Sequence, residues 1–165
     1  MTRVLGKRVL LSLTIAVAAV FVDQLTKAIA IGTLSPFTRV DALGSLLGWY
    51  LTFNDSAAFS LGWGVTWFFT LISTVALLVL LWALPKANTV GWAILGGFLL
   101  GGITGNLIDR FTRAPGFPNG QVVDFIQIPF NFPIFNIADC CISITMVIVA
   151  VRMVLGEPVG GAAAK

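Results

Sequence analysis

Four apolar stretches are each long enough to cross a lipid bilayer, and they limit the fold more than any other feature of the chain. They cover approximately residues 9–31, 65–84, 91–108 and 137–155. A helix needs about 20 apolar residues to span the hydrocarbon core. Only 10% of the 165 residues are charged, against roughly 25% in soluble domains. We therefore predict an all-α membrane protein with one integral membrane domain over residues 1–165.

The first span raises a question of its own, because basic residues followed by an apolar run also describe a signal peptide. Here the basic residues precede residue 9, and the apolar pattern continues past Asp23 and Lys27 to Ile31. Asp23 and Lys27 are four residues apart, so on a helix they share a face and can pair. We favour an uncleaved helix. The basic cluster before it predicts that both termini are cytoplasmic.

The two outer connections between spans, residues 32–64 and 109–136, are long and unusually apolar. Leu47–Phe53 is rich in aromatic residues, which favour strands. Pro129 and Pro133 argue against a helix in the second connection, where we place Asp124 in a loop. These segments predict a small outer cap with some strand content on the membrane surface.

The chain offers little catalytic chemistry. It contains no histidine, which removes Ser-His and Cys-His pairs and imidazole metal sites. Cys140 and Cys141 are adjacent in an apolar helical stretch, and neighbouring cysteines seldom bridge each other. We expect both to be small buried hydrophobic side chains. Paired carboxylates remain as acid and base groups.

Polar residues gather near the predicted outer ends of the spans, where function is the default explanation for a charge. Asn106 and Arg110 are four residues apart, so both can point into the bundle. Asp109 fits equally well as structural support, in a helix-end charge set that positions the following loop. The remaining members of this polar set are Asp23, Asn54, Asp55, Asp124, Asn136 and Asp139.

Asp124 and Asp139 are the strongest candidates for catalysis. Asp139 lies in the first turn of the fourth span, with Asn136 placed to cap that helix. Acidic residues are common in first helical turns, so a purely structural role for Asp139 stays open. Asp124 is flanked by apolar residues, and desolvation raises the pKa of a carboxyl. We hypothesise that one carboxyl donates a proton to a scissile carbonyl while the other takes one from water. The helix end favours Asp139 as the more easily ionised of the two.

Two other classes of function fit the same residues. Buried carboxylates and arginines also serve ion paths in transporters and channels. A structural or lipid-binding membrane protein would use the aspartates only at helix ends. Against an ion path, the charges gather at one predicted membrane face instead of crossing the bundle. The net charge of +3 is small and does not indicate nucleic acid.

Five ordered motifs cover nearly the whole chain: FVDQLTK (residues 21–27), NDSAAFS (54–60), GNLIDR (105–110), VVDF (122–125) and FNIAD (135–139). Together they resemble the motifs of the bacterial lipoprotein signal peptidases, or signal peptidase II. One departure is Ser56, because the family usually has glycine at that position, where a positive φ would strain serine.

The resemblance implies an aspartic endopeptidase of the bacterial inner membrane that globomycin inhibits. Such enzymes remove the signal peptide from diacylglyceryl-modified prolipoproteins, just before the lipidated cysteine. It implies a catalytic dyad of Asp124 and Asp139, with Asp23 helping to hold the site. It also implies substrate-binding residues at Asn54, Asn106, Arg110 and Asn136.

The resemblance further implies four transmembrane helices, a small periplasmic β-cradle and a short surface helix. The active site would face the periplasm, with no metal or cofactor. The expected partners are lipid-modified prolipoproteins and membrane lipids, with no nucleic acid, and we expect a monomer.

Overall fold

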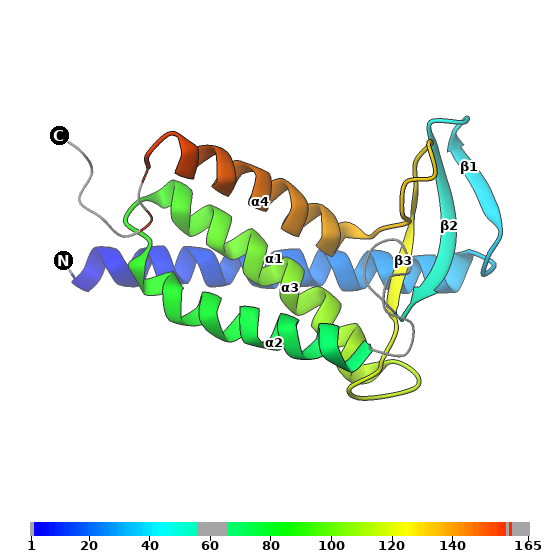
Figure 1. Cartoon of the computed structure of the whole chain (residues 1–165), viewed down its shortest axis with the longest axis horizontal. Coiled ribbons are helices and arrows are strands. Elements are labelled where there is room, and N and C mark those ends of the chain that lie inside the picture. The colour runs from blue at the N-terminus through cyan, green and yellow to red at the C-terminus, as the bar shows by residue number, and fades with distance from the viewer. Residues whose placement is uncertain (1, 56–65, 158, 160–165) are drawn as a thin grey trace.

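Four long helices form a bundle in the computed structural model, which describes residues 2–55, 66–157 and 159 (Figure 1). All four are long and apolar enough to cross a membrane, and they overlap the four apolar stretches predicted as spans. The first starts well before residue 9, because the basic residues ahead of the apolar run are helical too. The helices are α1 (Thr2–Thr33), α2 (Thr66–Ala83), α3 (Val90–Thr112) and α4 (Ile137–Val154).

A three-stranded antiparallel sheet lies at one end of the bundle (Figure 1). Its order is β1 (Arg39–Leu43), β2 (Leu47–Asn54) and β3 (Val122–Gln127). The strand predicted at Leu47–Phe53 is confirmed as β2. Asp124 lies in β3 opposite Thr52, and not in a loop as predicted. The prediction was wrong because the short run VVDFIQ becomes a strand only by pairing with β2, which is distant in sequence.

The predicted surface helix is not found within the described ranges. There, the only other helix is the 3-10 turn η2 (Leu84–Lys86), at the end of the bundle away from the sheet (Figure 1). Ser56 lies outside the described residues, so its predicted strain stays a prediction. α1 begins and α4 ends at that same far end (Figure 1).

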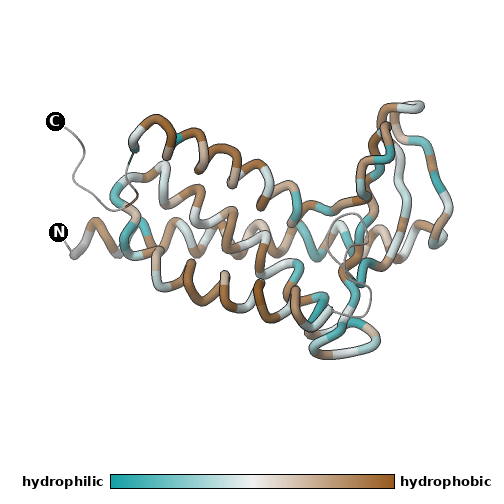
Figure 2. Tube along the Cα trace, viewed as in Figure 1, coloured by the Kyte–Doolittle hydropathy of each residue, from teal (hydrophilic) through white to brown (hydrophobic). Residues whose placement is uncertain are grey.

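The outer surface of the bundle is apolar. Brown segments follow the helices, and teal segments gather near the sheet and at the opposite helix ends (Figure 2). Exposed side chains on α2 include Leu71, Val75 and Leu78, and those on α4 include Val147 and Val151. Such surfaces are stable against lipid. The chain therefore has the surface of a multi-pass membrane protein.

α3 is the central helix, and small residues bring its neighbours close to it. A Cβ added at Gly101 would lie 2.6 Å from Ala19 Cβ and 2.9 Å from the Ala16 carbonyl oxygen of α1. A Cβ at Gly102 would lie 2.7 Å from the carbonyl oxygen of Ala138 in α4. Small residues allow this close approach of membrane helices. Polar side chains on α1, α3 and α4 are thereby brought within hydrogen-bonding distance.

An apolar cluster fixes the sheet to the end of α1. Ala30 of α1 packs with Leu51 of β2 and with Val123 and Phe125 of β3, and all four are buried. Val123 and Phe125 share one face of β3, so the intervening Asp124 projects from the other face. The cluster therefore sets the position of Asp124.

Candidate active site

Asp124 is buried in β3, with 2% of its surface exposed. Its Oδ2 accepts a hydrogen bond from Asn54 Nδ2 at 2.9 Å, and its Oδ1 accepts one from Asn136 Nδ2 at 2.7 Å. Burial, and then the nearby negative charge of Asp139, raise the pKa of Asp124 to about 7, although the two asparagines oppose the rise. Asp124 can therefore carry a proton near neutral pH.

Asp139 caps its own helix and also contacts the polar residues of the candidate site. It is the third residue of α4 and forms a capping box with Asn136. Its backbone N–H donates to Asn136 Oδ1 at 3.0 Å, and its Oδ2 accepts from the Asn136 backbone N–H at 3.1 Å. The predicted cap is thus confirmed. Its other oxygen, Oδ1, accepts from Asn106 Nδ2 at 2.8 Å, a contact that a cap does not need.

Asn136 links the carboxyl group of Asp124 to the first turn of the helix that carries Asp139. Its side chain is fully buried, and its Nδ2 donates to Asp124 Oδ1 while its Oδ1 accepts from the Asp139 backbone. The same Nδ2 lies 3.1 Å from Asn106 Oδ1 and 3.3 Å from the Val123 carbonyl oxygen. One amide therefore holds the strand that carries Asp124 against the helix that carries Asp139.

A buried charge cluster supports this arrangement. The predicted Asp23–Lys27 pair is confirmed, with Nζ 2.9 Å from Asp23 Oδ2, and Nζ is also 2.8 Å from Asp109 Oδ2. Asp23 Oδ1 accepts from the backbone N–H of Ala138 at the start of α4. Asp109 Oδ2 accepts from the backbone N–H of Val123 in β3. Both aspartates therefore connect the helices to the elements that carry Asp124 and Asp139.

Arg110 is also buried, and one guanidinium nitrogen, Nη1, donates to the Gly120 carbonyl oxygen at 3.4 Å. It lies within electrostatic reach of Asp124, Asp109, Asp139 and Asp55. A permanent positive charge beside carboxyl groups can hold a substrate carbonyl or a developing negative charge. Of the four predicted binding residues, Asn54 and Asn106 are half-buried, whereas Arg110 and Asn136 are buried.

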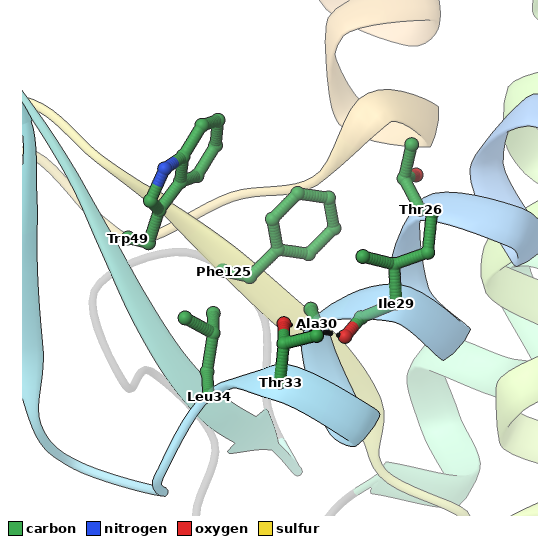
Figure 3. Close-up of a pocket in the computed structure, with 7 residues that line it drawn as sticks. All are labelled: Thr26, Ile29, Ala30, Thr33, Leu34, Trp49 and Phe125. Carbon is green, nitrogen blue, oxygen red and sulfur yellow. Dashed lines mark hydrogen bonds between the residues drawn. The ribbon is translucent and has the colours of Figure 1, made fainter.

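An apolar pocket of about 310 Å³ opens beside Phe125, the residue that follows Asp124 in β3 (Figure 3). The Thr26 and Thr33 hydroxyls in its wall donate to backbone carbonyls of their own helix, so they add little polarity. This pocket suits an apolar group, and none of its lining residues is a predicted site residue. Its other lining residues are Ile29, Ala30, Leu34 and Trp49.

The two cysteines are free thiols. Both are half-buried, whereas we predicted that both would be buried. Consecutive residues on a helix point about 100° apart, so they cannot both face the core. Within residues 2–55 and 66–157, no group of three or more His, Cys, Asp or Glu side chains is arranged to hold a metal ion.

Two residues of this network were missed as site residues. Lys27 was interpreted only as a local partner of Asp23, and Gln24 was not considered. Gln24 Nε2 donates to the Gly105 carbonyl oxygen at 3.1 Å and to Asp109 Oδ1 at 3.3 Å. Both residues lie in the motif FVDQLTK, and this motif is the sequence feature that could have identified them as site residues. Their contacts could not be predicted, because their partners on α3 are distant in sequence.

The comparisons with known proteins agree with the motifs. Residues 15–155 match the family model described as signal peptidase (SPase) II. A lipoprotein signal peptidase of Leifsonia xyli is 45% identical over 132 residues, which is 80% of this chain and 61% of the relative. One of Mycobacterium leprae is 37% identical over 150 residues, covering 91% of this chain and 74% of the relative. The chain thus matches about three fifths of the Leifsonia protein's length.

Solved structures show the same fold. A bacterial membrane enzyme determined by the in meso method at 2.3 Å resolution has a TM-score of 0.76 and 29% identity, with 93% of each chain covered. A second such structure, at 1.9 Å resolution, has a TM-score of 0.74 and 30% identity, with 86% of this chain and 91% of that chain covered.

Proposed function

The chain belongs to the signal peptidase II family, and we propose that it removes the signal peptide from lipid-modified bacterial prolipoproteins. It cleaves the amide bond just before the diacylglyceryl-modified cysteine, using Asp124, Asp139 and a water molecule. The observation that carries this proposal is a buried carboxyl group, Asp124, and a half-buried one, Asp139, which both accept hydrogen bonds from Asn136 at one end of a membrane bundle.

The two carboxyl groups take complementary roles. Asp124 is protonated near neutral pH, because its pKa is raised to about 7, and it donates that proton to the scissile carbonyl oxygen. Asp139 acts as a carboxylate and accepts a proton from water, whose oxygen attacks the carbonyl carbon. The tetrahedral intermediate then collapses. The amine of the lipidated cysteine leaves with the proton from Asp139, and the new carboxylic acid forms as Asp124 recovers its own.

The surrounding polar residues divide into two groups. Asn54 and Arg110 contact the substrate backbone, because they carry N–H donors suited to a peptide carbonyl close to Asp124. Asn106 and Asn136 keep the carboxyl groups in place, because their side chains are engaged with protein partners. Asp23 and Asp109 hold the helices that carry these residues.

The proposed location follows from the substrate and from the arrangement of the helices. The acyl chains of the substrate stay in lipid, so the scissile bond must meet water close to the membrane surface. The sheet end of the bundle, where the carboxyl groups lie, is the proposed periplasmic side. Both termini are then cytoplasmic, and the enzyme is a monomer in the inner membrane.

The ion-path alternative fits the structure less well. Among the described residues, the buried charged side chains are all in the half of the bundle near the sheet or in the sheet itself, so they do not form a path across it. They are Asp23, Lys27, Asp109, Arg110 and Asp124.

A cleavage assay with purified full-length protein tests the proposed function. The probes are a precursor peptide with a diacylglyceryl-modified cysteine and the same peptide without the lipid. We expect cleavage before the modified cysteine, identified by product mass, with slow or no cleavage of the unlipidated peptide and inhibition by globomycin. Equal rates on both peptides would overturn the substrate assignment.

A further inference from the structure

Lys27 carries a buried positive charge that the proposed chemistry does not use. Its side chain is fully buried in α1. Its Nζ lies 2.9 Å from Asp23 Oδ2, 2.8 Å from Asp109 Oδ2 and 3.0 Å from Asn106 Oδ1. An ammonium group has three donors and no acceptor. All three donors of Lys27 therefore have an oxygen partner.

Pairing with two aspartates is enough to explain a buried lysine, but it does not explain the third contact. Asn106 is an amide, and an amide can present either its oxygen or its nitrogen to a neighbour. Lys27 can only donate hydrogen bonds, so its ammonium group attracts the amide oxygen of Asn106 and repels the amide nitrogen. Asn136 Nδ2, 3.1 Å from the same oxygen, is a second donor with the same preference.

The orientation of Asn106 decides what Asp139 meets. With its oxygen toward Lys27, Asn106 directs Nδ2 to Asp139 Oδ1 at 2.8 Å. A rotation by 180° about the last side-chain bond would place the amide oxygen against the carboxylate and the NH₂ group against the ammonium. Both contacts would be repulsive. Lys27 thereby selects the rotamer in which Asp139 receives an N–H donor.

We propose that Lys27 is a positioning residue for the cleavage reaction: it fixes the Asn106 amide so that the Asp139 carboxylate is held by an N–H donor. Within the described residues, Lys27 donates no hydrogen bond to Asp124 or Asp139, so its positioning effect on Asp139 passes through Asn106. Its charge also lowers the pKa of Asp124 through space, an effect that does not depend on the Asn106 amide. This inference rests on the proposed function. Neither the family comparison nor the motif resemblance assigns this role to Lys27.

A double-mutant cycle between positions 27 and 106 tests the route of the effect. Lys27→Met keeps the length of the side chain and removes its donors. In the native background we expect kcat on the lipidated peptide to fall by about 10- to 100-fold, the usual effect of losing a group that orients a catalytic partner, with KM little changed. In the Asn106→Ala background the same substitution should lower kcat by less than about 3-fold, because the group it orients is gone.

Two further variants separate orientation from folding and from charge. Lys27→Arg retains the donors and the charge, and should recover most of the lost kcat. Arg113→Met removes another cation of the same cluster, whose Nε lies 2.6 Å from Asp109 Oδ1, and should lower stability without lowering kcat. If Lys27→Met does not fold, the cycle is repeated with Asp23→Asn in all variants. That change restores the charge balance, and its amide oxygen can still accept from Ala138.

The possible outcomes are distinct. An equal loss of kcat from Lys27→Met in both backgrounds would overturn the inference, because a folding or long-range charge effect does not depend on Asn106. An unchanged kcat in the native background would also overturn it. If the native enzyme fails to cleave the lipidated peptide, the proposed function itself fails. Native cleavage with an additive cycle refutes only the role of Lys27.

Discussion

Asn136 is the residue on which the geometry of both carboxyl groups depends. Its oxygen caps α4 through the Asp139 backbone, and its nitrogen donates to Asp124. These two functions belong to different atoms of one amide, so substitution can separate them.

We expect Asn136→Asp to keep the cap and lose the donor. The fold should be retained, because aspartate is as good an N-cap as asparagine. Cleavage should fall by about 100-fold or more, because a second carboxyl group replaces the N–H donor beside Asp124. Asn136→Ala should lose both the cap and the donor, and its free energy of unfolding should be ~1 kcal/mol lower than that of Asn136→Asp. Melting curves and kcat for the two variants test this, and wild-type activity in Asn136→Asp would contradict it.

The raised pKa of Asp124 predicts two effects of pH. Cleavage should decline as the pH rises above about 7, because the proton donor is then lost. The folded pKa lies above the ordinary value of 3.8, so the folded state binds this proton more tightly than the unfolded state. Its contribution to stability is complete below the ordinary pKa and is lost as the pH rises to about 7.

Asp124→Asn removes the titrating group and serves as the control. Its melting temperature should lack this component of the decrease between about pH 4 and pH 7, when both proteins are compared across the same buffers. Identical pH profiles of stability in the two proteins would show that Asp124 does not carry the shifted pKa.

At the scale of elements, the site depends on how closely α1 and α4 approach α3. Gly101 and Gly102 face different partners, so one turn of α3 packs against both neighbours. The hydropathy pattern predicted the helices, and the spacing of Asn106 and Arg110 predicted an inward face. Neither pattern predicted that Lys27 would contact Asp109, because that contact depends on the register between two helices far apart in sequence.

We expect Gly101→Ala to destabilise the bundle, because its Cβ would lie 2.9 Å from a backbone oxygen of Ala16. The free energy of unfolding should fall by about 1–3 kcal/mol, as in other overpacked interiors. Gly32→Ala is the matched control, since nothing lies within 4 Å of a Cβ there. Thermal unfolding in detergent compares them, and equal stability of the two variants would refute the close packing of α1 on α3.

At the scale of the whole molecule, the fold brings together residues from two unlike parts. Asp139 comes from a transmembrane helix, and its helix cap was predictable because Asn136 is only three residues away. Asp124 comes from a strand, which the sequence did not reveal because β3 exists only through its pairing with β2. The family motifs predicted that Asp124 and Asp139 belong to one site. Local patterns alone could not show that the Asn136 side chain contacts both the carboxyl group of Asp124 and the backbone of Asp139.

The central claim is that these two carboxyl groups act together on one water molecule. The most direct measurement is the turnover of a lipidated precursor peptide by purified Asp124→Asn and Asp139→Asn variants, with Asp41→Asn, a change at an exposed strand residue, as control. We predict that each site variant folds and loses activity by a factor of about 10³ or more, while the control cleaves at the native rate. Native-like turnover by either folded site variant would contradict the account.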